Sequence, residues 1–191
     1  MKIRKVFGVG INDLSRPIYP KLNGKRVMCP FYNRWLNMLR RCYCPKYQLR
    51  FPTYVGCSVA EEWLLFSNFE RWMKTQDWEG KELDKDLLKA GNKLYSPDFC
   101  VFIPQELNTF TTDSRANRGE YPLGVYLHRG SGRFKAQCSN PLTGRQEHLG
   151  YFDNPEDAHK AWRKRKHELA LIYADQQTDP RVAEALRTRY L

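Results

Sequence analysis

The segment RFKAQCS, residues 133–139, alternates polar and apolar side chains with a period of two. In a β-strand the polar side chains would share one face, and Phe134, Ala136 and Cys138 would share the other. Arginine and lysine donate hydrogen bonds to phosphates and to guanine, and glutamine can pair with adenine. The pattern therefore predicts a strand that packs on the core with one side and contacts nucleic acid with the other.

Neighbouring segments complete a small sheet around this strand. Turn residues at 130–132 and 140–144 separate it from two further predicted strands, 124–128 and 146–152. A helix is expected from Pro155, with Asp153 or Asn154 as its N-cap, because acidic residues follow in its first turn. We expect this helix to cover one face of the sheet. The residues expected beneath it are Phe134, Ala136, Cys138, Leu149 and Tyr151.

The other sheet face would remain open and is rich in hydrogen-bond donors. Its residues, all predicted to bind DNA, are Tyr126, His128, Arg133, Lys135, Gln137, Ser139, Gln146 and His148. None of them is acidic, which favours a nucleic acid as the partner. The alternative is an ordinary solvated face, which any small antiparallel sheet covered on one side also needs.

Positive charge is concentrated at the N-terminal end of the chain. The formal net charge is +11, and residues 1–50 contain twelve Lys and Arg but a single acidic residue, Asp13. Aromatic residues are interleaved with these cations, a combination that suits a phosphate backbone. On a helix predicted over 32–42, Arg34, Arg40 and Arg41 lie off the apolar stripe and are expected to grip DNA. A basic surface that only aids solubility is the alternative.

The sequence shows no targeting or membrane-spanning segment, so we expect a cytoplasmic protein. No apolar run approaches the roughly 18–20 residues that span a bilayer, and the N-terminus lacks the apolar core of a signal peptide. We therefore expect reduced cysteines and no membrane partner. The alternative is that some of the thiols bind a structural Zn²⁺, although their spacing is unusual for a zinc site. Its candidate ligands are Cys29, Cys42, Cys44 and Cys57.

The predicted fold class is α+β, with two domains. The polar segment 108–122 lacks apolar periodicity and reads as a linker. We predict an N-terminal domain over 1–110, a linker over 111–121, a sheet-and-helix domain over 122–174 and an extension over 175–191. The N-terminal domain should combine helices at 32–42 and 59–76 with two short strands and a small helix near 104–108.

The C-terminal part of the chain resembles a known DNA-binding family. Residues 124–162, GVYLHRGSGRFKAQCSNPLTGRQEHLGYFDNPEDAHKAW, are similar to the Apetala-type domain of plant ethylene-response factors and of many phage and mobile-element proteins. The match covers about residues 121–174. The resemblance implies that DNA is read by the open face of a three-stranded sheet, at the positions predicted above. Many of the plant arginines and tryptophans are replaced here, so a different target sequence is implied.

The N-terminal part resembles phage proteins related to His-Asn-His (HNH) homing endonucleases. The similar segments are RWLNMLRRCY, YVGCSVAEEWLLFSNFERWM and LDKDLLKAGNKLYSPDFCVF. In that family a histidine at the end of a strand activates water, and an Asn or His helps to hold one divalent metal. Here the matching motif carries Asp84, Lys85 and Asp86, so a lysine occupies the position of the base. The resemblance leaves Asp84, Asp86 and Asn108 as candidate ligands of Mg²⁺.

The sequence therefore predicts a phage-type protein that binds double-stranded DNA through the sheet and the basic N-terminal domain, without catalysis. One alternative is a divergent metal-dependent DNA endonuclease of the homing type. A second is a phage effector that binds a host protein and retains the DNA-binding fold only by ancestry. A steep loss of DNA affinity with salt distinguishes the first two from the third.

Overall fold

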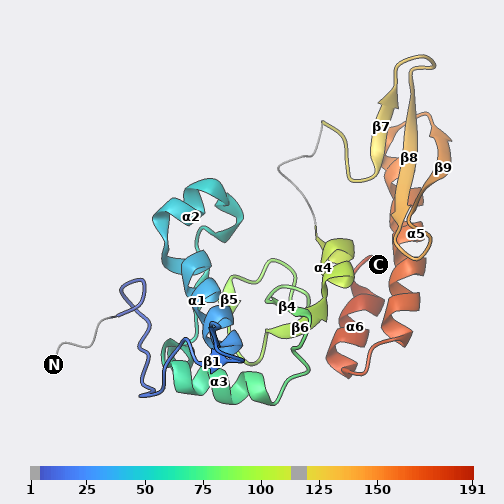
Figure 1. Cartoon of the computed structure of the whole chain (residues 1–191). Helices are drawn as coiled ribbons and strands as arrows, with labels where there is room; N and C mark the ends of the chain where they lie inside the picture. The colour runs from blue at the N-terminus through green and yellow to red at the C-terminus, as the bar shows by residue number, and fades with distance from the viewer. Residues whose placement is uncertain (1–4, 113–119) are drawn as a thin grey trace. The chain divides into compact units, whose positions relative to one another are not determined.

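The structure is a computed structural model that describes residues 5–112 and 120–191. The chain is α+β, as predicted, and divides into two compact units, Met1–Pro104 and Gln105–Leu191 (Figure 1). The division falls earlier than the predicted boundary at residue 110, because the short helix after Pro104 belongs to the C-terminal unit. Most of the predicted linker 111–121 lies outside the described residues.

Aromatic side chains form the core of the N-terminal unit. Helices α1 (Pro30–Tyr43) and α3 (Phe66–Lys74) pack against each other through apolar residues at helical spacing. Trp35 is fully buried, and its indole N–H donates to the carbonyl of Trp63 over 2.7 Å, which satisfies the polar atom of a core side chain. The predicted helix at 32–42 is confirmed by α1.

The single helix predicted over 59–76 is wrong. The segment forms β3 (Ser58–Val59), the 3₁₀ helix η2 (Glu61–Leu64) and α3, with Leu65 extended between the last two. Ile11 causes the break, because its N–H donates to the Leu64 carbonyl over 2.8 Å and its carbonyl accepts from Phe66 N–H over 3.0 Å. A distant strand-like contact thus replaces the intrahelical bonds that the aromatic periodicity had predicted.

Short strand pairs complete the N-terminal unit. Strand β4 (Lys81–Asp84) pairs antiparallel with β6 (Val101–Pro104), and these are the two short strands predicted in this region. Strand β3 pairs parallel with β5 (Leu94–Tyr95). Three further elements were not predicted from the sequence: the hairpin of β1 (Lys21–Leu22) and β2 (Lys25–Arg26), the helix α2 (Pro45–Arg50) and the 3₁₀ helix η1 (Pro52–Tyr54).

The C-terminal unit is a three-stranded antiparallel sheet packed on a long helix. The sheet order is β7 (Val125–His128), β8 (Arg133–Asn140) and β9 (Arg145–Phe152), followed by α5 (Pro155–Asp175). The first half of α5 covers the sheet. Helix α5 also packs against α6 (Pro180–Thr188), and α6 occupies most of the predicted extension 175–191.

The helix α4 (Gln105–Thr111) packs within the C-terminal unit. The rings of Phe110 and Tyr173 lie 5.0 Å apart, and the Tyr173 hydroxyl donates to Glu106 over 2.5 Å. These contacts join α4 to α5. The bounds of α4 confirm the small helix predicted near 104–108. Within the described residues, no helix has the length and apolar character required to cross a bilayer.

Candidate nucleic-acid interface

Strand register brings the predicted DNA-binding residues of the sheet onto one face. Tyr126 lies opposite Lys135 on the neighbouring strand, and His128 lies opposite Arg133. Further along β8, Gln137 pairs with His148 and Ser139 pairs with Gln146. Because directly paired residues point to the same side of a sheet, all eight predicted side chains share a face.

Helix α5 covers the opposite face and leaves this one open. Val125, Ala136 and Ala158 are buried at the centre of the sheet–helix contact, with Phe134 and Phe152 packed around them. The helix begins where predicted, because the Asn154 side chain accepts a hydrogen bond from Asp157 N–H over 2.8 Å. On the open side Tyr126 is 55% exposed, so its ring is available to a partner.

The structure corrects the predicted position of Tyr151. Strict alternation along β9 placed Tyr151 beneath the helix, together with Leu149. A β-bulge interrupts the β8–β9 pairing, since Ala136 pairs with Gly150 and the next residue, Gln137, pairs with His148. Gly150 adopts a φ of +131°, which glycine tolerates at bulges. Leu149 packs inward, and Tyr151 points to the open face with 40% of its surface exposed.

The sequence contains a signal for this bulge. Leu149 and Phe152 are both apolar but are three residues apart, which a regular strand cannot bury on one face. The glycine between them is the residue type that most often marks a bulge. We name the complete set of nine open-face residues the outer face. It consists of Tyr126, His128, Arg133, Lys135, Gln137, Ser139, Gln146, His148 and Tyr151.

Aromatic contacts organise the centre of the outer face. Tyr151 lies between two imidazoles, with ring centroids 5.2 Å from His128 and 4.9 Å from His148, both edge-to-face. Lys135 is flanked in register by Tyr126 and Tyr151, one on each neighbouring strand. The lysine is therefore presented between two tyrosines. Such a row can offer a positive charge to a phosphate group and, at the same time, apolar contact to the edge of a base.

Polar side chains at both ends of the outer face are held by local hydrogen bonds. The Ser139 hydroxyl donates to Gln146 Oε1 over 2.8 Å, and His128 Nδ1 lies 2.8 Å from the Ser131 hydroxyl. Arg133 Nε donates to Asp153 over 2.9 Å, but both side chains are solvent-exposed. Exposed ion pairs contribute little free energy, so a phosphate can compete with Asp153 for this arginine.

Glu147, on the inner side of the sheet, has its negative charge compensated by an arginine of α5. Arg165 donates to both carboxylate oxygens of Glu147, over 2.6 Å and 3.1 Å, and Asn140 donates to the same group over 2.7 Å. These hydrogen bonds lower the pKa of Glu147 to about 2. The carboxylate therefore stays ionised with its charge compensated, and it faces away from the outer face.

The three arginines predicted to grip DNA occupy different environments on α1. Arg40 is exposed, with its guanidinium 4.8 Å from the centroid of the Tyr47 ring. Arg34 pairs with Glu82 over 2.9 Å and donates to a backbone carbonyl on β4. Arg41 contacts tyrosines of the unit instead of solvent, including a hydrogen bond to Tyr95. Of the three, Arg40 is the one whose charge is displayed to solvent.

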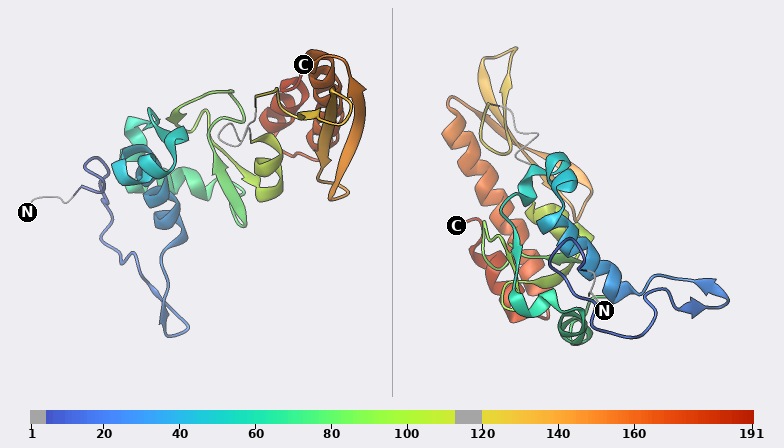
Figure 2. Two further views of the ribbon diagram at one scale, coloured as in Figure 1. Left: turned by 90° about the horizontal axis from the view of Figure 1, so that it is seen from above. Right: turned by 90° about the vertical axis from the view of Figure 1, so that its left-hand side faces the viewer.

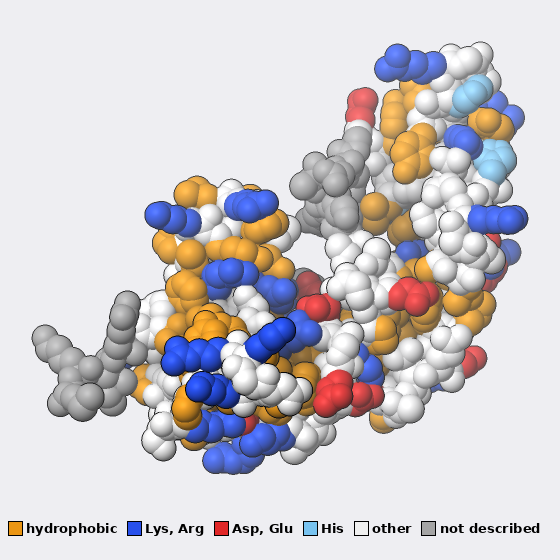
Figure 3. All heavy atoms as spheres, viewed as in Figure 1, with side chains coloured by type: hydrophobic (Ala, Val, Ile, Leu, Met, Phe, Trp, Pro, Cys, Tyr) orange, Lys and Arg blue, Asp and Glu red, His pale blue; other side chains and the backbone are white. Residues whose placement is uncertain are grey.

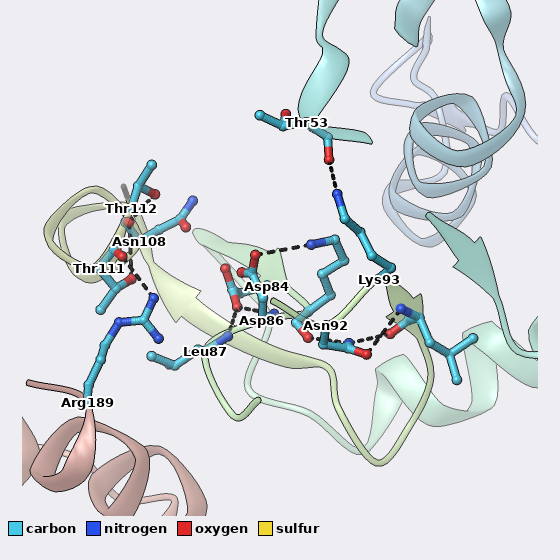
Figure 4. A network of polar contacts seen from close by, with 12 residues as sticks. Thr53, Asp84, Asp86, Leu87, Asn92, Lys93, Asn108, Thr111, Thr112 and Arg189 are labelled. Atoms are coloured by element: carbon cyan, nitrogen blue, oxygen red, sulfur yellow. Dashed lines mark hydrogen bonds and ion pairs between the residues drawn. The ribbon is translucent and has the colours of Figure 1, made fainter. Parts of the chain in front are cut away.

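The residues matched to a nuclease motif form a structural turn after β4 (Figure 4). Asp84 accepts hydrogen bonds from the backbone N–H groups of Asp86 over 2.9 Å and Leu87 over 2.6 Å. Burial, and then the charge of Asp86, raise the pKa of Asp84. The Lys85 ammonium lies 3.1 Å from Asp86 and is largely buried. Asn108 lies on α4, which belongs to the other unit.

The structure does not gather the four cysteines considered for zinc. Within residues 5–112 and 120–191, no three His, Cys, Asp or Glu side chains are placed to hold a metal. Cys42 and Cys57 lie near each other, but burial raises the pKa of both thiols, that of Cys42 to about 12. Burial in apolar surroundings thus favours the neutral form of both thiols.

Comparison of the chain with protein-family models, curated proteins and solved structures found no match. The two family resemblances therefore remain expectations from the sequence.

Proposed function

We propose that the chain is a protein that binds double-stranded DNA through the outer face, without catalysis. The observation that carries the proposal is the common register of nine side chains, none of them acidic, on the uncovered side of a sheet. A twisted sheet face with this inventory is complementary to a DNA groove. Lys135 and Arg133 would contact phosphates or guanine, and Gln137 would contact base edges.

Electrostatics of the rest of the chain support the same partner. Lys and Arg side chains crowd the visible face of the N-terminal unit (Figure 3). No acidic residue occurs between Asp13 and Glu61, a stretch that includes all of α1 and α2. Such a field attracts a polyanion over distances comparable to the Debye length, about 8 Å at physiological salt.

The test is a titration of labelled duplex DNA, followed by fluorescence anisotropy at roughly 50 and 200 mM salt. Arg133→Ala combined with Lys135→Ala should weaken binding at least tenfold, a loss of about 1.4 kcal/mol. The salt slope should fall by about 2, because two phosphate contacts are lost. Thermal unfolding should be nearly unchanged, since both side chains are on the solvent side of the sheet.

Lys160→Ala combined with Lys164→Ala is the matched control, because it removes the same number of cations from exposed positions on α5 rather than from the outer face. This variant should retain wild-type affinity within about twofold. Equal losses of DNA affinity in the control and the double variant would show that only the net charge of the protein matters, not the position of the cations. Unchanged affinity of the double variant would refute the role of the outer face.

The alternative of a metal-dependent endonuclease has a direct test. We expect supercoiled plasmid to stay intact with the protein and Mg²⁺ or Mn²⁺, because Asp84 is engaged by two backbone donors and a lysine follows it. Agarose gels with and without EDTA provide the measurement. Nicking that EDTA stops and Asp84→Ala abolishes would establish the nuclease instead.

A further inference from the structure

The β1–β2 hairpin is a separate basic element of the N-terminal unit. All residues from Lys21 to Arg26 are exposed, and the two strands extend away from the rest of the unit in both views of Figure 2, in blue. Asn23 and Gly24 connect them with φ values of +48° and +79°. Positive φ at both central residues defines the type I′ turn that matches strand twist, so the tip is a tight, well-formed reversal.

The base of the hairpin is anchored in the core. Cys29 is buried, and its N–H donates to the Ile18 carbonyl over 2.8 Å. The N–H of Val27 donates to the Pro20 carbonyl over 3.0 Å, which continues the ladder toward the tip. About five residues on each side then reach roughly 15 Å from the base, at about 3.3 Å per residue. The hairpin is thus a preorganised arm instead of a loose loop.

Among residues 5–112 and 120–191, the charges of the arm have no ion-pair or hydrogen-bond partner. Lys21 lies directly opposite Arg26, and Lys25 is the remaining cation of the pair of strands. None of the three side chains forms an ion pair or hydrogen bond with any residue that the structure describes. Like charges directly opposite each other destabilise a strand pair. A hairpin of this kind gains stability when an anion lies across the two strands.

Two other cations of the same acid-free stretch, one on each side of the arm, form ion pairs with carboxylates. Arg16, just before the hairpin, forms an ion pair with Glu70, and Arg34, just after it, pairs with Glu82. Both partners belong to later elements of the unit, α3 and β4. In the part of the chain that the structure describes, carboxylates therefore pair with Arg16 and Arg34 but not with the three cations of the arm.

We infer that the β1–β2 hairpin is a second duplex-DNA contact that inserts into a groove, with Lys21, Lys25 and Arg26 on the phosphates. A two-stranded ribbon fits the major groove, which is about 8.5 Å deep, so the length of the arm suffices. Leu22, 63% exposed beside these cations, would contact the groove wall. This inference rests on the proposed function, because it assigns a further contact with the same ligand.

The test compares three full-length proteins on the same labelled duplex. The arm variant combines Lys21→Gln, Lys25→Gln and Arg26→Gln. The control variant removes the same charge from exposed positions elsewhere on the unit, through Arg71→Gln, Lys89→Gln and Lys93→Gln. Anisotropy titrations at several salt concentrations give the affinity and its salt slope. Circular dichroism should show the arm variant melting as the wild type does, because its substituted side chains are all exposed.

We expect the arm variant to lose at least tenfold in affinity and about 2–3 units of salt slope, since each lost phosphate contact removes about 0.9. The control should lose less than one unit. Equal losses in the two variants, or none in the arm variant, would overturn the inference while leaving DNA binding in place. A wild-type protein that does not bind the duplex would instead overturn the proposed function, and this inference with it.

One other reading of the arm makes an opposite prediction. Lysines on open strand edges also prevent edge-to-edge association of sheets. If that were their purpose, the arm variant would self-associate at unchanged DNA affinity. Sedimentation velocity of the same three proteins measures this. We expect all three to sediment alike, and concentration-dependent association confined to the arm variant with retained binding would refute the DNA contact.

Discussion

Gly124, the residue just before β7, has a conformation and a close contact with α5 that only glycine accommodates. It has a φ of +76°, and a Cβ placed on it would lie 2.0 Å from Cδ1 of Trp162. The indole cannot withdraw easily, because it is stacked on His159 with centroids 5.3 Å apart. His159 is itself fixed by a 2.9 Å hydrogen bond between Nδ1 and the Leu123 carbonyl. A single glycine thus lets β7 approach α5.

Gly124→Ala should therefore destabilise the protein by about 2–4 kcal/mol, the sum of left-handed strain and an overpacked contact. Gly144→Ala is the control, because Gly144 also has a positive φ, +66°, but nothing lies within 4 Å of the added Cβ. The control should cost about 1–2 kcal/mol. Urea unfolding followed by circular dichroism measures both. Equal costs at the two positions would show that the Trp162 contact contributes nothing.

Single residues of the sheet were predictable where one simple rule governs them. The period-two pattern of β8 placed Arg133, Lys135 and Gln137 on the open face, and the register agrees. The same rule failed at Tyr151, because the bulge before it changes the phase of the alternation. The roles of Arg34 and Arg41 were not accessible from helical spacing, since their partners Glu82 and Tyr95 lie on distant strands.

At the level of elements, a largely buried lysine of α5, Lys166, contacts aromatic rings of α4 and of the C-terminal residues. The Lys166 ammonium lies 3.5 Å from the centroid of the Phe110 ring on α4 and 5.7 Å from that of Tyr190. Burial lowers the pKa of Lys166 to about 8, and the nearby Arg189 acts in the same direction. The thiol of Cys138 has the opposite influence, and the π face of Phe110 also favours the charged form.

The lowered pKa predicts how stability depends on pH. Between pH 8 and the ordinary value near 10.5, the folded state binds fewer protons than the unfolded chain, so the free energy of unfolding rises with pH. Below pH 8 the Lys166 ammonium is charged in both states, so the free-energy cost of burying this charge lowers the stability of the folded protein in full. Lys166→Met should therefore stabilise the protein at pH 7 by about 1–3 kcal/mol, with the gain shrinking from pH 8 to pH 10.

Urea unfolding of wild type and Lys166→Met at pH 7, 8, 9 and 10 gives this difference directly. Titrating groups other than Cys138, whose pKa the charge of Lys166 lowers, are common to both proteins and cancel. A variant less stable than the wild type at pH 7 would show that the contact with Phe110 outweighs the cost of burial. A difference that does not change with pH would show that Lys166 keeps an ordinary pKa.

Elements were predictable where local signals agree with the tertiary structure. The start of α5 follows from its cap, and α1 follows from its apolar stripe. The N-cap Asp179 and the Pro180 after it signal α6 in the same way, although this segment was predicted only as an extension. The break at Leu65 had no local signal, because Ile11 imposes it from more than fifty residues away.

On the scale of the whole molecule, cationic surface is present on both units. The outer face carries Arg133 and Lys135 in the C-terminal unit, and the β1–β2 arm carries three cations in the N-terminal unit. A chain that binds one duplex with both units gains from their covalent connection, because the second contact becomes intramolecular. Either site alone then needs only a moderate affinity.

Combining the outer-face and arm substitutions tests whether both units contact the same duplex. The two sets of residues lie in different units and share no partner, so their free-energy penalties should add within about 0.5 kcal/mol. The five lost cations should lower the salt slope by about 4–5 in total. Anisotropy on a duplex long enough for both units, with each parent variant alongside, measures these values. A combined variant that binds as well as the weaker parent would show that only one unit engages the DNA at a time.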